Sequence, residues 1–460
     1  MKNYLGQTLQ LTALVTGLLL LISAVSEEFA IGGLTLRKMD ILHDIRPDAP
    51  TATTDSLTAE LPDSVLVKPD TSLAAEQKWA MPDSAQFGKI FEDYTPDHSG
   101  LGAFYAAIDS IKTAGRTVRV AWFGDSFVEG DILLGDLRDT LQSVWGGQGV
   151  GFVPITSEVA QFRRTFKQSA FGGGWRTFGI VKNDDSGQPF GINGFVYLPR
   201  PGGSVRYDGL DYFKNTNRFD QFRLFYASDS DVPFVWQNAG QPPKTDRLPA
   251  KPGKIGQWKF AVPSTGMGAF AVRFPDSTGA KLYGASLESS TGFYLDNFSM
   301  RGLTGGKLRL IRPDIMRQFD SYLRYDLVVV QLGLNAVTNS LRNIPWYERE
   351  LDETFEHLRK CFPDKPILIV SVADRGGKVN GELATMPAVW HIVSMQRALA
   401  QKHGFLFFDL YRGMGGAGTM LAFNKLRPKL ANDDFTHLTH DGGRVVGQML
   451  AKVFLRRDEL

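Results

Sequence analysis

The chain is poor in cysteine, since Cys361 is the single cysteine among 460 residues. One thiol cannot form an internal disulfide, and it cannot supply the ligands of a Cys-based zinc site. The histidine and acidic residues also show no cluster with the spacing of metal ligands. The sequence therefore predicts a protein that is stabilised by its apolar core and uses neither a metal ion nor another cofactor.

An excess of charge of one sign is also missing. Lys and Arg together number 51 and Asp and Glu number 49, which gives a formal net charge of +2. Proteins that bind nucleic acid concentrate basic side chains against the phosphates, so the balance argues against nucleic acid as a partner. The glycine-rich segment 413–418 lacks the Lys-Ser/Thr of a phosphate-binding loop. We interpret this segment as a loop at the rim of a substrate site.

Charged residues are absent from residues 9–25, which follow Lys2 and precede Glu27 and Glu28. A basic residue followed by an apolar run is typical of an export signal, and the run is only just long enough for a membrane span. We predict that residues 1–26 are a signal peptide or an uncleaved N-terminal anchor, which would attach the chain to the inner membrane through residues 9–25. Both alternatives place the remaining chain outside the cytoplasm, either periplasmic or secreted.

The remaining sequence divides by its hydrophobic pattern. Residues 27–88 are rich in Pro, Asp, Ser, Thr and Ala without periodicity, which predicts a flexible linker. Residues 89–146 and 291–460 alternate short apolar strands with helical patterns, which is typical of a parallel sheet covered by helices on both faces. Residues 147–290 contain short alternating runs between Gly and Pro turns, which predicts an all-β unit. We therefore expect one α/β domain that is interrupted by a β-rich insertion.

Several polar motifs follow predicted strands, where functional residues of open α/β sheets collect. A nucleophilic serine needs a base, an acidic residue that orients the base, and donors for the oxyanion. Ser126 in Gly-Asp-Ser is the candidate nucleophile, and Asp434 and His437 are the candidate acid and base. The Ser126 N–H, a glycine N–H and the Asn335 amide of Gly-Leu-Asn are candidate oxyanion donors.

Each motif taken alone has an ordinary structural explanation. Gly-Asp-Ser is common in turns after strands, Gly-x-Asn is common at helix caps, and Asp-x-x-His arises by chance. His440 beside Asp441 is a second candidate base, although the spacing from Asp434 favours His437. The placement of all the motifs at strand ends of one sheet favours the catalytic interpretation.

Three segments of the chain together resemble the motif blocks of the SGNH, or GDSL-type, hydrolase family. They are "GDSFVEG" (124–130), "GLN" (333–335) and "DFTHLTHDG" (434–442). The resemblance implies that Ser126, Asp434 and His437 are catalytic and that Ser126, Asn335 and a second-block glycine form the oxyanion hole. Our candidate for that glycine is Gly302 in "YLDNFSMRG", where Arg301 departs from the small residues usual in this block. The implied fold is a three-layer, flavodoxin-like α/β domain.

Segment 407–439 further resembles bacterial peptidoglycan or polysaccharide O-acetylesterases, which often carry a β-sandwich insertion after the first block. The expected function is an extracytoplasmic serine esterase that removes O-acetyl groups from an acetylated glycan of the cell envelope. The alternatives are an O-acetyltransferase of the same fold and a non-catalytic glycan-binding protein. Aromatic residues of the insertion either stack on sugars or pack in its core, and we favour core packing for most of them. These residues are Trp175, Phe190, Tyr197, Trp236 and Trp258.

Overall fold

The computed structural model describes residues 29–31, 34–36, 90–182, 186–262 and 266–455. The predicted signal or anchor segment and most of the predicted linker lie outside the described residues. The chain divides into two units, residues 1–68 and 69–460. In the first unit, β1 (Phe29–Ile31) and β2 (Leu34–Leu36) pair antiparallel within the range predicted as linker. Among the described residues, no helix combines the length and apolar character needed to cross a membrane.

The second unit contains a six-stranded sheet with the order β16-β4-β17-β18-β21-β3. Neighbouring strands from β16 to β21 are parallel, and β3 pairs antiparallel with β21. In chain order the parallel strands read 2-1-3-4-5, which is the flavodoxin-like order. The α/β prediction is therefore confirmed, but the sheet is mixed rather than all parallel. The strands are β3 (Phe91–Asp93), β4 (Thr117–Gly124), β16 (Gly292–Ser299), β17 (Leu327–Gln331), β18 (Ile367–Val370) and β21 (Leu406–Phe408).

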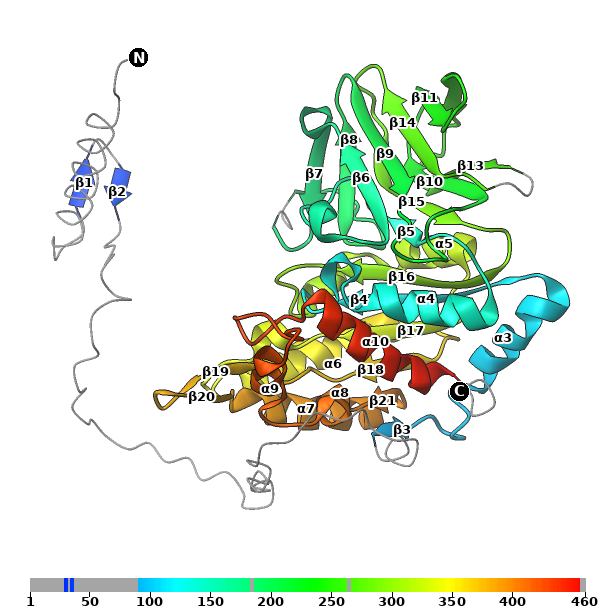
Figure 1. Cartoon of the computed structure of the whole chain (residues 1–460). Coiled ribbons are helices and arrows are strands. Elements are labelled where there is room, and N and C mark those ends of the chain that lie inside the picture. Colours follow the sequence, from blue (N-terminus) through cyan, green and yellow to red (C-terminus); the bar gives the residue numbers. More distant parts are fainter. Residues whose placement is uncertain (1–28, 32–33, 37–89, 183–185, 263–265, 456–460) are drawn as a thin grey trace, which may run out of the picture. The chain divides into compact units, whose positions relative to one another are not determined.

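Helices cover both faces of this sheet (Figure 1). Adjacent strand residues point to opposite faces: Trp122 of β4 contacts Phe454 of α10, whereas Phe123 contacts Phe362 after α6. Phe104 of α3 contacts both Trp145 of α4 and Phe454, so α3, α4 and α10 share the first face. The helices are α3 (Gly102–Ala114), α4 (Leu134–Trp145), α5 (Pro313–Leu323), α6 (Ile344–Cys361), α7 (Ala388–His403), α8 (Leu410–Met414), α9 (Thr419–Lys425) and α10 (His440–Phe454).

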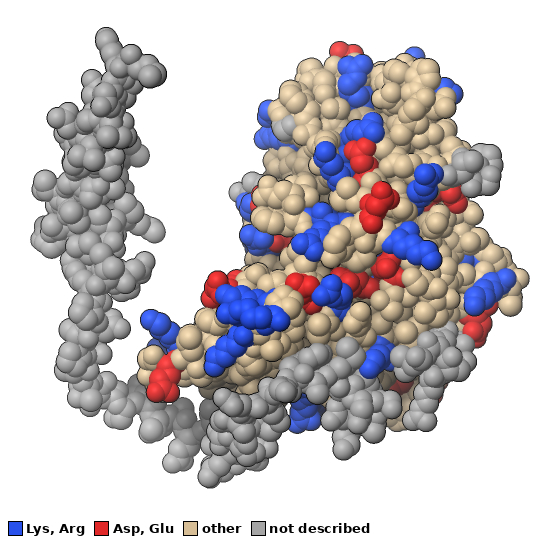
Figure 2. Space-filling view, viewed as in Figure 1, with Lys and Arg blue, Asp and Glu red and all other residues tan. Residues whose placement is uncertain are grey.

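Short elements connect the main helices and strands. They are the 3-10 helices η3 (Glu129–Asp131), η4 (Ala160–Phe162), η5 (Gly172–Gly174), η6 (Gly306–Leu310) and η7 (Leu334–Ala336), and a hairpin of β19 (Gly376–Val379) and β20 (Glu382–Thr385). On the face seen in Figure 2, acidic and basic side chains are interspersed over the described part, as the near-zero net charge leads one to expect.

The chain between α4 and β16 forms two antiparallel sheets (Figure 1). One sheet has the strand order β13-β10-β15-β8-β7, with β5 beside β15. The other sheet has the strand order β12-β11-β14-β9-β6. Side chains from both sheets share one apolar cluster, because alternate residues of each strand point inward. The strands are β5 (Gly151–Val153), β6 (Phe166–Ala170), β7 (Trp175–Gly179), β8 (Phe195–Pro199), β9 (Gly203–Gly209), β10 (Gln221–Ala227), β11 (Val232–Asn238), β12 (Lys244–Leu248), β13 (Gly256–Ala261), β14 (Ala269–Phe274) and β15 (Lys281–Glu288).

A buried ion cluster joins the inserted sheets to the α/β sheet. Arg119 Nη1 of β4 donates to both carboxylate oxygens of Asp296 in β16, at 2.8 and 2.9 Å, and Nη2 donates to Glu288 of β15. Arg223 of β10 also pairs with Glu288, at 2.8 Å. Burial alone would raise the pKa of Glu288, but the two arginines outweigh it and lower that pKa to about 2. Glu288 therefore stays charged, and its ion pair with Arg119 fastens the insertion to β4.

Candidate active site

Ser126 lies in a turn directly after β4, beside the point where the strand order of the sheet reverses. The carboxylate of Asp125 shapes this turn, because its Oδ1 accepts the N–H of Phe127 at 3.0 Å. The Ser126 carbonyl accepts the N–H of Glu129 at 3.4 Å, and the chain continues into η3. The turn leaves Ser126 partly exposed, while Asp125 is buried.

His437 and Asp434 lie in the loop before α10 and complete a hydrogen-bonded chain with Ser126. The distance from Ser126 Oγ to His437 Nε2 is 2.9 Å, and the distance from His437 Nδ1 to Asp434 Oδ2 is 2.6 Å. Asp434 Oδ1 also accepts the backbone N–H groups of Thr436, at 2.9 Å, and of His437, at 3.0 Å. These contacts fix the imidazole so that Nε2 can take a proton from the Ser126 hydroxyl. The structure thus brings together the three residues that the sequence singled out from distant positions.

The environment of Asp434 favours its charged form. Burial opposes ionisation, but the hydrogen bonds from the His437 side chain and backbone and from Thr436 outweigh it, so the pKa of Asp434 lies below its usual value. Asp434 is therefore a carboxylate at neutral pH. A carboxylate beside Nδ1 stabilises the imidazolium that forms when His437 accepts a proton.

Asp125 connects the serine turn to the loop that carries Asn335. Its second oxygen, Oδ2, accepts the N–H of Leu334 at 3.1 Å. Burial raises the pKa of Asp125. The two N–H bonds and the nearby charges of His437 and Arg375 lower it, but burial outweighs them and the pKa is about 6. The sequence alone assigns this aspartate no separate role. The structure shows that one buried carboxylate holds two of the motif loops together.

Asn335 lies in η7, directly after β17, with its side chain exposed. Its Nδ2 donates to the carbonyl of Leu303 at 3.0 Å, so the Asn335 loop is tied to the turn that contains Gly302. Arg375, which follows β18, supports the same loop from the other side: its Nη1 donates to the carbonyls of Leu334, at 2.8 Å, and Val337, at 3.0 Å. The sequence analysis did not predict this supporting contact.

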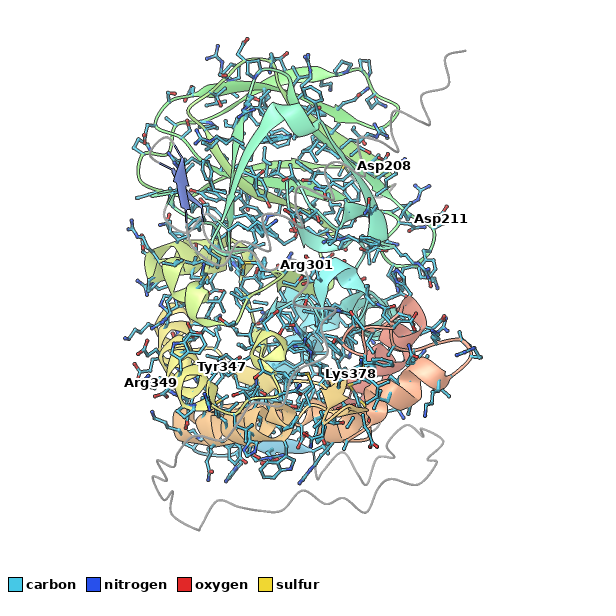
Figure 3. All side chains as sticks on the ribbon, turned by 90° about the vertical axis from the view of Figure 1, so that its left-hand side faces the viewer. Asp208, Asp211, Arg301, Tyr347, Arg349 and Lys378 are labelled. Carbon is cyan, nitrogen blue, oxygen red and sulfur yellow. The ribbon has the colours of Figure 1, made fainter. Side chains whose placement is uncertain are left out.

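Gly302 lies in a turn at the carboxyl end of β16, next to β4. Its φ of +79° is in the left-handed region, which favours glycine. The turn is closed by the N–H of Leu303 on the carbonyl of Met300, and the N–H of Met300 binds the carbonyl of Gly124. Arg301 forms an ion pair with Glu129 at 2.8 Å, and Figure 3 shows Arg301 between the inserted sheets and the α/β domain. These contacts place the Gly302 turn beside the Ser126 turn.

His440, the second candidate base, begins α10 and lies near the backbone of Phe162, whereas His437 is the histidine bonded to Ser126. Burial, together with the charge of Arg164, lowers the pKa of His440. His437 is therefore the histidine that contacts the serine. Among the described residues, no group of three or more His, Cys, Asp or Glu side chains is arranged to hold a metal ion.

The aromatic residues named in the insertion lie in its interior. Trp175, Phe190, Tyr197 and Trp236 are buried, and Trp258 is half-buried. Trp236 stacks on Phe270 and Trp258 lies against Phe234. Core packing therefore explains the four buried side chains, and the half-buried Trp258 packs against the core of the insertion.

Comparison with known proteins agrees with this geometry. Residues 264–445 match the model of the GDSL-like lipase/acylhydrolase family, a range that includes Gly302, Asn335, Asp434 and His437. No curated protein matches the chain. The solved structure of a peptidoglycan O-acetylesterase superposes with a TM-score of 0.64 at 20% identity, over 79% of this chain and 98% of that chain.

Two further structures align with lower scores. An acetyl xylan esterase gives a TM-score of 0.28 at 21% identity, over 35% of this chain and 82% of its own. A family two carbohydrate esterase from Clostridium thermocellum gives a TM-score of 0.26 at 10% identity, over 58% of this chain and 97% of its own. Residues 264–445 thus match the GDSL-like lipase/acylhydrolase family model, and the chain shares the fold of the peptidoglycan O-acetylesterase structure.

Proposed function

We propose that this protein is an extracytoplasmic serine esterase that removes O-acetyl groups from a cell-envelope carbohydrate polymer, either peptidoglycan or another polysaccharide. The observation that carries the proposal is the hydrogen-bonded chain from Ser126 through His437 to Asp434. The similarity in fold to a peptidoglycan O-acetylesterase favours an acetyl ester of a glycan as substrate. The apolar run 9–25 behind Lys2 favours a location outside the cytoplasm.

In the first half-reaction, Ser126 Oγ attacks the carbonyl carbon of the acetyl group while His437 Nε2 takes the hydroxyl proton. The negative charge that forms on the carbonyl oxygen needs donors that are already in place. We assign this role to the N–H groups of Ser126 and Gly302 and to the amide of Asn335. The proton then passes from His437 to the sugar oxygen, the ester bond breaks, and an acetyl group remains on Ser126.

In the second half-reaction, His437 removes a proton from a water molecule, which attacks the acetyl-serine. The bond to Ser126 Oγ breaks, the serine regains its proton from His437, and acetate leaves. Asp434 stays charged throughout and holds the imidazole in the required orientation. Asp125 and Arg375 keep the serine turn and the Asn335 loop at a fixed separation through their backbone hydrogen bonds.

The proposal is tested by measuring acetate release from O-acetylated peptidoglycan and from acetylated xylan, together with hydrolysis of a chromogenic acetyl ester. We expect the wild-type chain to release acetate and the Ser126→Ala variant to lose at least about 10³-fold in kcat. Release of acetate only when a glycan acceptor is withheld, with transfer to the acceptor when it is supplied, would instead identify an O-acetyltransferase. Binding of glycan without turnover of any ester would contradict an enzymatic role.

A further inference from the structure

A cavity of about 390 Å³ lies between the inserted sheets and the carboxyl end of β16. Its floor includes Ser299, which pairs with Gly124 at the end of β4, and its wall includes Glu129, whose N–H binds the carbonyl of Ser126. The other side is lined by residues of the insertion, such as Arg163 and Asn193. The cavity therefore begins beside the turn that carries Ser126, one strand away from β4.

The charged groups that line this cavity cancel in pairs, with one exception. Glu129 pairs with Arg301, and Glu158 pairs with Lys182. The Arg163 backbone N–H binds the carbonyl of Ala160, but its side chain makes no hydrogen bond or ion pair with any residue that the structure describes, and its Nε is buried without a partner. The cavity thus carries one uncompensated positive charge, and the donor groups of that guanidinium are free for a ligand.

Neighbouring residues hold Arg163 in place without using its donors. Its guanidinium lies over the ring of Phe166, 4.9 Å from the ring centre. Asp131 is also near, and its charge acts on Arg163. However, the Asp131 carboxylate is already engaged by Arg138, by the Thr165 hydroxyl at 2.8 Å and by the Asn297 amide at 2.8 Å. The charge of Asp131 therefore acts on Arg163 without a hydrogen bond between the two side chains.

Asn193 supplies a second unused donor in the same cavity. The side chain is only 5% exposed and acts on the Tyr197 hydroxyl nearby, but its Nδ2 has no partner with the distance and angle of a hydrogen bond among the described residues. Its Oδ1 accepts the N–H of Phe195 at 3.3 Å, which fixes the amide so that Nδ2 remains the free end. A buried amide donor without a partner is costly, and an oxygen of a ligand would remove that cost.

We propose that this cavity is a subsite for a carboxylate-bearing sugar residue next to the acetylated one, with Arg163 as the cation that binds the carboxylate and Asn193 as an accompanying donor. This inference rests on the proposed function, because it concerns the glycan that reaches Ser126. A guanidinium matches a planar carboxylate with two parallel N–H bonds, which a neutral sugar hydroxyl cannot reproduce. The site therefore selects acidic glycans over neutral ones.

The test compares an acetylated oligogalacturonide, which is acidic, with an acetylated xylo-oligosaccharide, which is neutral, on the full-length chain. We expect Arg163→Met to raise KM for the acidic substrate by about 10- to 100-fold, the loss of one charged hydrogen bond, with KM for the neutral substrate and kcat for a chromogenic acetyl ester within twofold. Arg163→Lys should retain part of the preference. Lys259→Met, which removes an exposed cation of β13, is the matched control and should change neither KM.

Several outcomes would overturn the subsite. One is that the wild-type protein has the same KM for the acidic and the neutral substrate. Another is that Arg163→Met changes both KM values equally. The third is that Lys259→Met raises KM for the acidic substrate as much as Arg163→Met does. If the wild-type chain hydrolyses no acetyl ester, the proposed function fails, and calorimetry with unacetylated oligogalacturonide then decides the subsite alone. Tighter binding by the wild type than by Arg163→Met would support the subsite, and equal or absent binding would overturn it.

Discussion

The two ends of strand β4 use charged residues in different ways. Near its start, Arg119 is buried and its Nη atoms are bound by Asp296 and Glu288, which are also buried. After its end, Ser126, His437 and Asp434 are partly exposed and are joined by single hydrogen bonds. Buried carboxylates beside Arg119 hold its charge inside the protein, whereas the groups after the strand end remain accessible to a substrate.

The difference shows how one strand carries both stability and reactivity. The Arg119 cluster connects β4 to the insertion, and the low pKa of Glu288 keeps that carboxylate ionised beside its two arginines. The Ser126 end is held by backbone hydrogen bonds to Asp125 and Arg375, which position the reactive groups and leave the Ser126 hydroxyl open on one side. Substitutions at the two ends should therefore separate effects on stability from effects on activity.

The largest effect is expected from His437→Ala. Without the imidazole, the Ser126 hydroxyl has no base, so kcat for a chromogenic acetyl ester should fall by about 10³- to 10⁵-fold. Because the side chain is partly exposed, the thermal midpoint should change by only a few degrees. A variant that keeps more than a tenth of wild-type turnover would show that His437 is not the base.

The next effect concerns the other end of β4. Arg119→Met leaves the Asp296 and Glu288 carboxylates buried without their cation, which should lower the free energy of unfolding by about 3–5 kcal/mol. Denaturant unfolding followed by fluorescence measures this change. The kcat of the remaining folded protein should stay within about threefold of wild type. A loss of activity without a loss of stability would contradict the division between the two ends.

Asp125→Asn should affect both properties at the site end. The asparagine oxygen can accept one of the N–H groups of Phe127 and Leu334, while its NH₂ group faces the other, so the two loops should shift and kcat should fall by about 10- to 100-fold. A stability measurement in parallel shows whether the variant has simply unfolded.

The same variant tests the titration of Asp125. Its folded pKa of about 6 lies above the unfolded value of about 3.9. The folded state thus binds the extra proton between these pH values, and the contribution of Asp125 to stability falls as pH rises through this window. The wild type should lose about 3 kcal/mol from this group between pH 4 and pH 7, whereas Asn should not. Parallel pH profiles for the two proteins would contradict the raised pKa.

The smallest effect is expected from Arg375→Met. The loop with Asn335 loses the contacts to the Leu334 and Val337 carbonyls but keeps the N–H bond to Asp125. We expect kcat to fall by about three- to tenfold with KM unchanged, since the loop would position the oxyanion donor less well. Arg375→Lys should recover part of kcat, and a change in KM alone would contradict this positioning role.

The sequence was sufficient for the fold class and for the residues that meet at the sheet edge. Continuous apolar strands and periodic helices predicted the α/β domain, and the order of the motifs brought Ser126, Asn335 and His437 to strand ends. The antiparallel β3 was missed because it has only three residues and a sequence, Phe-Glu-Asp, with little strand character. Gly302 was selected by its position after the insertion, and the positive φ that favours glycine there is visible only in the backbone.

Other features of the site depend on contacts between distant segments. Asp125 reads as an ordinary turn residue, and its bond to Leu334 crosses between β4 and β17. Arg375 likewise looks like a strand-end residue, and its support for the Asn335 loop follows from tertiary packing. The missing hydrogen-bond partner of Arg163 Nε could not be predicted from the sequence, because it is recognised only when the neighbours of the side chain are known.

The central claim is that Ser126 forms an acetyl-enzyme. The most direct measurement is to quench the wild-type protein during turnover of a chromogenic acetyl ester and to locate the acetyl group by peptide mass spectrometry. The account predicts one acetyl group on the peptide that contains Ser126, and none on that peptide in Ser126→Ala, which should also be inactive. Wild-type-like turnover by Ser126→Ala, or an acetyl group carried by another residue during turnover, would contradict it.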